Sequence, residues 1–355
     1  TKTNHMVIDQ STDKSVINWQ SFSIHKHGRV DFNMPNSKSM SLNRVSGSTP
    51  SRIAGQLNST GQVYLINPHG IIVTPSGKVK TNSFTASSLD INNQDFLNNN
   101  FTFNKSTKAN KGVINSGKIT LGSAGHANLF GSNIRNDGII NAKLGKINIG
   151  AGEKITLDIE GDGLMSVILP VEKLDSIKDI NGNSIKSLIS NNGSLVSEGG
   201  FITLSAATAN SLSTGAINLG PSSELISTSY NSQTGRVQIG GFSNNYVETS
   251  GKIDVSSKDF NSSSGNISIK GKNIYQGATL NANGINGGKI EVLSEDLLVL
   301  NGKLEAKGLQ KDGGSLIVMS ENVLLSSYKN TLDVSGVKKG GNIQSIANDY
   351  NLASG

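Results

Sequence analysis

The feature that most constrains this fold is a repeat in the second half of the chain. Four segments open with glycine, a variable residue and a branched apolar residue, and the openings lie 23, 26 and 27 residues apart: Gly265-Asn266-Ile267, Gly288-Lys289-Ile290, Gly314-Ser315-Leu316 and Gly341-Asn342-Ile343. A repeat of this length is typical of stacked supersecondary units. We therefore expect a solenoid in which each unit packs only against its neighbours.

Each repeat contains three short strand patterns. In the unit that opens at Gly288, Ile290 and Val292 alternate with charged residues, residues 297–300 are apolar, and a third alternating piece surrounds Leu304. Turn residues separate these pieces, and no helical pattern of 10–15 residues lies between them. Three strands per repeat without helices predict an all-β parallel β-helix. A leucine-rich horseshoe is the nearest alternative, but its consensus positions do not recur.

The β-helix interpretation predicts which residues stack. Inward residues of successive coils lie about 4.8 Å apart, so Ile267, Ile290, Leu316 and Ile343 are expected to form one column. Leu304 is expected to face the dry core.

The first part of the chain has a different pattern. Residues 1 to about 105 contain dense strand-like pieces that we interpret as an irregular N-terminal cap, because a bare first coil would expose apolar core and strand edges. Residues 160–190 fit the repeat badly, so we expect extra-helical β elements there, such as a hairpin. The abrupt start and end suggest a trimmed part of a longer protein.

Composition agrees with a narrow solenoid and argues against several other classes. Only 35% of residues are hydrophobic and 5% aromatic, whereas apolar residues with glycine make up roughly 45–50% of a typical globular domain. The net charge is +6, but the basic residues are scattered, so no nucleic-acid partner is expected. No apolar run approaches the ~20 residues of a membrane helix, and cysteine is absent.

Three segments carry a family resemblance. Residues 16–22 (VINWQSF), 62–71 (QVYLINPHGI) and 82–91 (NSFTASSLDI) resemble, in the same order, the secretion domain of two-partner secretion exoproteins. That family includes filamentous haemagglutinins and high-molecular-weight adhesins, and the chain is most similar to adhesins of the exoprotein A and high-molecular-weight type. The strongest similarity covers residues 5–105, and a looser β-helix similarity runs to the end.

The resemblance implies a fold and a function. Family members are large filaments that Gram-negative bacteria export through the periplasm to the cell surface or medium. Their secretion domain is recognised by periplasmic modules of a dedicated outer-membrane β-barrel transporter, and it nucleates a right-handed parallel β-helix outside the cell. On this basis we expect a secretion domain at 1–250 and continuing coils of the exoprotein stalk at 251–355. We also expect a monomer without cofactor or catalytic role, and a host or bacterial surface receptor for the full-length virulence protein.

The resemblance also points to candidate residues for transporter recognition. They lie in the second and third segments: Asn67, Pro68, His69, Gly70, Ile71, Asn82, Phe84, Thr85, Ala86 and Ser87. His69 departs from the family, where asparagine is usual. A structural turn, in which the Asn67 side chain satisfies backbone groups, is the favoured alternative and is compatible with recognition.

Six Asn-x-Ser/Thr sequons are candidate glycosylation sites, because some adhesins of this family carry sugars at such sequences. They are Asn58, Asn100, Asn104, Asn192, Asn261 and Asn266. Many sequons arise by chance in a chain rich in asparagine and serine. Modification requires an exposed side chain, which favours Asn104, Asn261 and Asn266.

Other functions have weaker support from the sequence. Polysaccharide-degrading enzymes also use parallel β-helices, but they need clustered carboxylates, and acidic residues here are scattered. His25 and His27 share one strand face without a further ligand nearby, so no metal site is expected. A passenger of a single-chain autotransporter remains an alternative, which a separate transporter gene would exclude.

Overall fold

The computed structural model describes residues 4–106, 111–158, 165–169, 177–207, 216–240, 246–257, 262–328 and 330–353. The chain divides into two compact units, residues 1–189 and 190–355. Both are parallel β-helices, the fold class that the repeat predicts.

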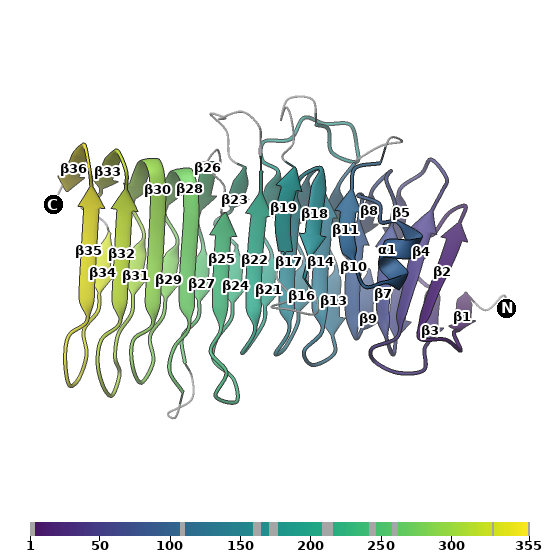
Figure 1. Cartoon of the computed structure of the whole chain (residues 1–355), viewed down its shortest axis with the longest axis horizontal. Coiled ribbons are helices and arrows are strands. Elements are labelled where there is room, and N and C mark those ends of the chain that lie inside the picture. The colour runs from purple at the N-terminus through teal and green to yellow at the C-terminus, as the bar shows by residue number, and fades with distance from the viewer. Residues whose placement is uncertain are drawn as a thin grey trace. The chain divides into compact units, whose positions relative to one another are not determined.

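Unit 1 consists of three series of parallel strands, and a complete coil contributes one strand to each series (Figure 1). The first series is β1 (His5–Asp9), β3 (Arg29–Asn33), β6 (Gln56–Ser59), β9 (Lys78–Thr81), β13 (Lys118–Leu121) and β16 (Ile139–Asn141). The second is β2 (Lys14–Trp19), β4 (Met40–Val45), β7 (Gln62–Ile66), β10 (Ser83–Ser87), β14 (His126–Gly131) and β17 (Lys146–Ala151). The third is β5 (Ser51–Ile53), β8 (Ile71–Val73), β12 (Val113–Asn115) and β15 (Ile134–Asn136).

The regular coils begin earlier than the sequence analysis predicted. β1 already pairs in parallel with β3, placing Met6 opposite Val30, and Val30 lies opposite Leu57 in β6. The expectation of an irregular cap over residues 1 to about 105 is therefore corrected for the strands before residue 88. The sequence period is lost in this region because a long insertion separates β10 from β12 and lengthens that one coil.

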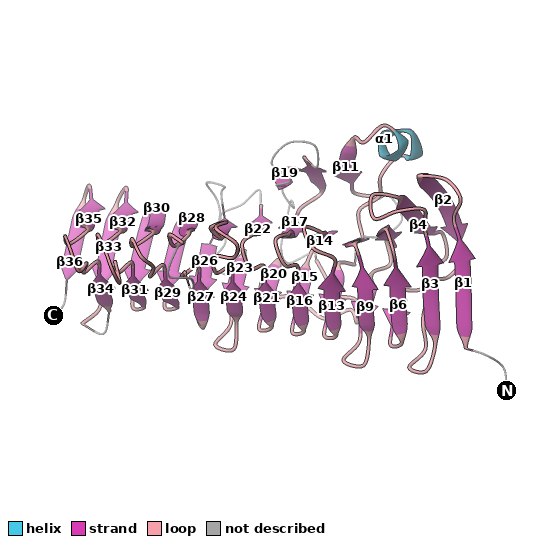
Figure 2. Ribbon diagram, turned by 90° about the horizontal axis from the view of Figure 1, so that it is seen from below, coloured by secondary structure: helices cyan, strands magenta, loops and turns pink. Residues whose placement is uncertain are grey.

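This insertion and a later one form an outer layer on unit 1. Helix α1 (Asn93–Leu97) and β11 (Phe101–Asn104) come from the first insertion. β11 pairs antiparallel with β18 (Lys154–Leu157), which pairs antiparallel with β19 (Met165–Leu169). Figures 1 and 2 show α1, β11 and β19 outside the parallel strands. Extra-helical strands were predicted at 160–190, and β19 is one; residues 159–164 and 170–176 lie outside the described residues.

Unit 2 repeats the three series. The first is β21 (Ser194–Val196), β24 (Glu224–Ile226), β27 (Lys252–Asp254), β29 (Thr279–Asn281), β31 (Lys303–Glu305) and β34 (Thr331–Asp333). The second is β22 (Phe201–Ala206), β25 (Arg236–Gly240), β28 (Asn266–Gln276), β30 (Lys289–Leu300), β32 (Ser315–Ser320) and β35 (Asn342–Ala347). The third is β20 (Ile189–Asn191), β23 (Ile217–Leu219), β26 (Tyr246–Thr249), the second halves of β28 and β30, β33 (Val323–Ser326) and β36 (Tyr350–Ala353).

The predicted apolar column is confirmed. Ile267 pairs with Ile290, Ile290 with Leu316, and Leu316 with Ile343. The first three side chains are 1%, 0% and 0% exposed, whereas Ile343 in the last coil is 42% exposed. The core therefore consists of stacked branched side chains, each covered by its counterpart in the next coil.

Helical structure is confined to a single short turn in the part of the chain that the structure describes. The Asn92 side chain accepts a hydrogen bond from the Gln94 N–H and so caps the first turn of α1. No helix among the described residues is long and apolar enough to cross a bilayer.

Candidate functional site

The Asn67 side chain holds a buried turn between β7 and β8. Its amide nitrogen donates to the Thr49 carbonyl and to the Ser51 hydroxyl, both at 3.0 Å, and its oxygen accepts from the His69 N–H at 2.9 Å. Asn67 is fully buried, and the Gly70 N–H donates to its carbonyl at 2.9 Å. The asparagine therefore bonds three polar groups of the turn, of which the buried Ser51 hydroxyl would otherwise lose water without a partner.

The remaining turn residues differ in how accessible they are. Pro68, Gly70 and Ile71 are buried, while His69 is half-buried. Gly70 adopts φ of 102°, and a Cβ atom there would lie 2.7 Å from Ile180 Cγ1. Glycine is therefore required by both backbone conformation and space, and His69 is the one side chain of the turn with substantial contact to solvent.

The third segment forms β10, which is buried on both faces. Phe84 and Ala86 are fully buried opposite Val63 and Leu65 in the core. Thr85 points to the other face, where its hydroxyl accepts from the Asn128 amide at 2.9 Å. The Ser87 hydroxyl donates to the Leu89 carbonyl at 2.8 Å. The half-buried Asn82 donates to the Ser37 carbonyl at 3.0 Å, joining two coils at a turn.

The outer layer explains why the second face of β7 and β10 is dry. Tyr64 lies 5.2 Å from Phe96 of α1 and 5.7 Å from Phe101 of β11, measured between ring centroids. Phe103 packs against Phe130 in the same way, at 5.2 Å. Burial raises the pKa of the Tyr64 hydroxyl. The second and third sequence segments are therefore covered by an aromatic layer in the folded protein.

The first segment packs separately from this layer, at the start of unit 1. Trp19 is half-buried, stacks edge-on against Phe22 at 5.4 Å, and donates from Nε1 to the Asn43 side chain at 2.9 Å. Asn43 is fully buried in the next coil. The single tryptophan thus packs between the first two coils.

Two cations from early coils hold the outer layer in place. The Lys14 ammonium donates to the carbonyls of Phe96 and Leu97, at 3.2 and 2.6 Å, and to the Asn99 side chain at 2.6 Å. Arg44 forms an ion pair with Asp90 at 2.9 Å and donates to the Asn93 side chain at 2.6 Å. A cation at the C-terminal end of a helix is favourable, because the last carbonyls carry partial negative charge.

A cluster of hydrogen bonds around the Asp31 carboxylate joins the first three coils of unit 1. Asp31 accepts from His5 at 2.7 Å and from Arg29 and Asn58 at 2.8 Å. Burial alone would raise the pKa of Asp31, but the hydrogen bonds from Arg29, Asn58 and His5 outweigh it and lower the pKa to about 2. The ionised form of Asp31 is therefore the form that stabilises these coils.

This cluster predicts a specific loss of stability in acid. Because the pKa of Asp31 is depressed on folding, its contribution is present above about pH 4 and is lost as the pH falls towards 2. We expect the thermal midpoint of the wild type to fall more steeply over that range than that of Asp31→Asn. Glu224→Gln, which alters an exposed carboxylate, should track the wild type. Parallel curves for Asp31→Asn and wild type would contradict the assignment.

The sequons differ in accessibility. Asn100, Asn104, Asn192 and Asn266 are exposed, and Asn261 lies outside the described residues. Asn58 is half-buried and its amide is engaged with Asp31. Exposure therefore favours the first four as acceptors, including Asn104 and Asn266 as expected.

The most buried carboxylates of unit 2 are paired with lysines. Asp254 forms an ion pair with Lys252 at 2.9 Å, and Glu305 with Lys303 and Lys307 at 2.9 and 2.8 Å. Burial would raise the pKa of both carboxyls, but hydrogen bonds from these partners lower it overall. A general acid needs a raised pKa, so neither group is suited to that role. Among the described residues no group of three histidine or acidic side chains is placed to hold a metal ion.

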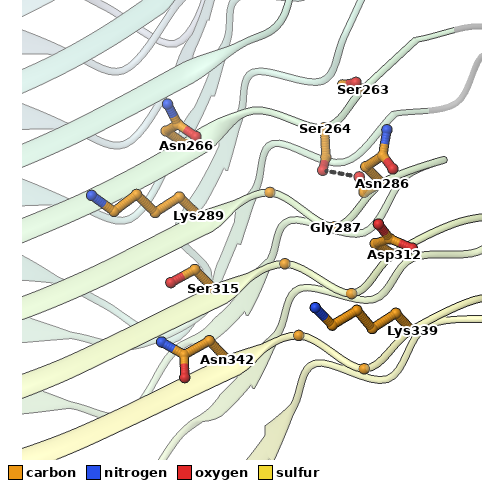
Figure 3. A pocket seen from close by; sticks show the side chains of 15 residues that line it. Ser263, Ser264, Asn266, Asn286, Gly287, Lys289, Asp312, Ser315, Lys339 and Asn342 are labelled. Atoms are coloured by element: carbon orange, nitrogen blue, oxygen red, sulfur yellow. Dashed lines mark hydrogen bonds between the residues drawn. The ribbon is translucent and has the colours of Figure 1, made fainter.

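Unit 2 also contains an open polar groove of about 780 Å³ (Figure 3). It runs past Lys289, Asp312 and Lys339, and the Ser264 hydroxyl donates to the Asn286 carbonyl at 2.9 Å. The paired glycines along it have a packing reason, since a Cβ atom on Gly313 would lie 1.8 Å from the Val334 carbonyl oxygen. The glycine lining of the groove therefore follows from the close packing of neighbouring coils and does not require a ligand.

Sequence reasoning missed the residues that attach the outer layer. Lys14 and Arg44 lie in strands, and in the sequence a single charged residue in a strand is indistinguishable from one that simply faces solvent. The early coils did carry a signal, because Gly28, Gly55 and Gly77 each precede a strand with the same Gly-x-apolar opening as the later repeats.

Comparison with known proteins decides the family. A family model described as the TPS secretion domain matches residues 1–226. The chain belongs to the TPS secretion domain family. The crystal structure of the HMW1 secretion domain from Haemophilus influenzae is similar with a TM-score of 0.81 and 25% identity, covering 100% of this chain and 93% of that one. This is a secretion-domain family and not an enzyme family, and its members are exported through the periplasm to the cell surface or beyond.

The curated relatives are much longer than the region they share with this chain. A heme/hemopexin-binding protein of Haemophilus influenzae strain Rd is 31% identical over 210 residues, which make up 57% of this chain and 22% of that protein. A second heme/hemopexin-binding protein of Haemophilus influenzae is 35% identical over 108 residues, or 30% of this chain and 12% of that protein. Family membership supports the secretion-domain prediction over the polysaccharide-degrading enzyme and the autotransporter passenger.

Proposed function

We propose that this chain directs export through a dedicated outer-membrane transporter whose periplasmic modules recognise residues in the first unit. The observation that carries the proposal is the TPS secretion domain match over residues 1–226, which includes all three sequence segments. We also propose a secretion domain at 1–250 followed by stalk coils at 251–355, and the match over residues 1–226 supports the first of these.

The recognition residues act through the shape and exposure of the segment that contains them. Asn67, Thr85 and Ser87 are at most 1% exposed, so their side chains do not reach a partner in the folded domain. We infer that they hold the turn and β10 in place, and that His69 and the exposed residues around α1 offer the contact surface. The transporter would contact the buried residues Asn67, Thr85 and Ser87 only before the outer layer packs over β7 and β10.

Secretion with and without the cognate transporter tests the proposal. The full chain with its natural export signal is expressed in a Gram-negative host, and the amount in the medium is compared with the amount in the periplasm. We expect release to the medium only when the transporter is present. Equal release in its absence would overturn the proposed function, and a single-chain passenger would then be the better interpretation.

The activity of the full-length protein is a separate proposal. The resemblance to high-molecular-weight adhesins supports an adhesive filament. The curated relatives are named for binding heme and hemopexin, which makes heme–hemopexin capture the second candidate. Binding of host cells or of heme–hemopexin by the full-length protein distinguishes the two.

We also propose that exposed sequons accept sugars before export. Asn100, Asn104, Asn192 and Asn266 have accessible side chains, and surface exposure is what the modification requires. The intact mass of the secreted protein should exceed that of the bare chain, and Asn→Gln variants at these positions should remove the excess. A mass equal to the bare chain would reject this proposal.

A further inference from the structure

The outer face of unit 2 changes from polar to apolar along the chain. Strand registers place outward residues of successive coils in columns, and in each column a polar residue of β28 is followed by apolar residues in β30 and then β32 or β33. The columns are Lys270–Leu293–Met319, Asn273–Leu297–Val323 and Tyr275–Val299–Leu325, the last opening with a tyrosine. Ile346, Tyr350 and Leu352 continue them in the last coil.

These outward apolar residues are not part of the core. Their inward neighbours Val292, Leu298, Val318 and Leu324 are fully buried. We call Leu293, Leu297, Val299, Met319, Val323 and Leu325 the outer patch; all six are half-buried in the described structure. The β-helix would fold equally well with polar residues there, as β28 shows at Lys270 and Asn273. Leu293 and Met319 adjoin in the second series of strands, and the other four adjoin in the third series. Partly exposed apolar side chains that adjoin on an otherwise polar surface are typical of an interaction site.

Unit 1 shows what kind of element covers such a face in this chain. Tyr64 and Phe130 also point outward from parallel strands, and they are 2% and 0% exposed because the outer layer packs on them. That layer consists mainly of extended strands with alternating apolar side chains, such as Phe101 and Phe103 of β11. Figures 1 and 2 show this layer over unit 1 strands. The outer patch has the same chemistry without its own covering strand among the described residues.

A cleft beside the outer patch indicates the charge of the missing strand. It has a volume of about 220 Å³ and is lined by Leu293 and Met319 together with Glu295, Glu321 and Lys270. Neither glutamate forms an ion pair within the described part of the chain. Two carboxylates and one ammonium group therefore line this cleft together with two apolar side chains. A lysine or arginine side chain fits this arrangement, because its stem is apolar and its end is cationic.

The size of the outer patch favours a short segment over a second copy of this chain. Two or three coils spaced about 4.8 Å apart extend the patch over only ~10–15 Å. A stable protein–protein interface buries roughly 800 Å² on each partner, which needs a much larger face. A strand of about five residues has the matching length, at ~3.3 Å per residue.

We propose that the outer patch binds an extended, basic segment of a partner polypeptide. Alternate apolar side chains of the segment pack on Leu297, Val299, Val323 and Leu325. One lysine or arginine enters the cleft, with its stem against Leu293 and Met319 and its cation beside Glu295 and Glu321. This interaction is independent of the transporter and uses the coils beyond the family match.

Binding of defined peptides to the full chain tests the proposal. The probe is a fluorescein-labelled heptapeptide with valine at positions 1, 3 and 5, arginine at position 7 on the same strand face, and threonine at the positions between them. Its matched counterpart has glutamate at position 7. We expect fluorescence anisotropy to detect binding of the basic peptide only. Met319→Thr/Leu325→Thr and Glu295→Gln/Glu321→Gln should each weaken it by about tenfold or more, which corresponds to about 1.4 kcal/mol. Ser268→Thr, at an outward position of β28, should leave it within about twofold of wild type.

Each alternative result overturns the proposal. Equal binding of the acidic peptide would remove the role of Glu295 and Glu321. Undiminished binding to Met319→Thr/Leu325→Thr would place the peptide elsewhere, and no binding of the basic peptide would reject the site. Self-association of the wild type that Leu325→Thr abolishes would make a second copy the occupant. Unchanged thermal midpoints of the variants show that any loss arises at the surface and not from unfolding.

Discussion

Leu304→Asp is expected to lower the free energy of unfolding by more than ~3 kcal/mol, because it buries an unpaired charge or an unpaired carboxylic acid. Leu304 is fully buried and lies in register between Leu280 and Leu332. An aspartate there contacts apolar side chains in the coils on either side, and no polar group replaces the lost water.

Urea unfolding followed by circular dichroism measures this effect. Thr279→Asp is the matched control, because Thr279 pairs with Lys303 at an outward, half-buried position one coil earlier. Its cost is expected to stay within about 0.5 kcal/mol of wild type. A near-neutral Leu304→Asp would show that Leu304 faces water, and the column assignment for this series of strands would be wrong.

Asn67→Ala is expected to cost about 2–4 kcal/mol and to reduce secretion. The substitution removes the partner of the Thr49 carbonyl, the Ser51 hydroxyl and the His69 N–H, of which the Ser51 hydroxyl is fully buried. An unsatisfied buried polar group costs roughly 1–3 kcal/mol, and loss of the two part-buried bonds adds to it. The turn between β7 and β8 would loosen, and with it the position of Gly70 against the neighbouring coil.

Two measurements separate stability from recognition. Thermal unfolding reports the structural cost, and the secreted fraction in the presence of the transporter reports export. His69→Asn is the control within the same turn, because it restores the residue usual in the family at a half-buried position; both readouts should stay near wild type. Normal secretion and unchanged stability of Asn67→Ala would contradict the structural role of this asparagine.

The repeat made the fold of the second half predictable, because every coil must place a branched apolar residue at the same inward position. Ile267, Ile290 and Leu316 obey that constraint, and their spacing is visible in the sequence. The first half was harder to predict because its coils differ in length: the insertion that contains α1 and β11 interrupts the period just where a regular coil would continue.

The candidate site was predictable in part. The turn at Asn67 follows from Asn-Pro and His-Gly, both strong turn signals. The burial of β10 on both faces could not be predicted, since it depends on Phe96, Phe101 and Phe103 folding back over a strand that precedes them. Charges such as Lys14 and Arg44 carry no sequence mark of their partners, which lie 46 to 85 positions away.

The hydrogen bonds of Lys14 set a minimum chain length below which the outer layer cannot attach to the first coils. Its ammonium meets residues 82 to 85 positions further along the polypeptide. If the chain crosses the outer membrane from one end, these partners reach the same side as Lys14 only after nearly a hundred residues have crossed. Until then the outward face of the earliest coils lacks its outer layer. The hydrogen bonds of Lys14 can therefore form only when the α1 region has also crossed.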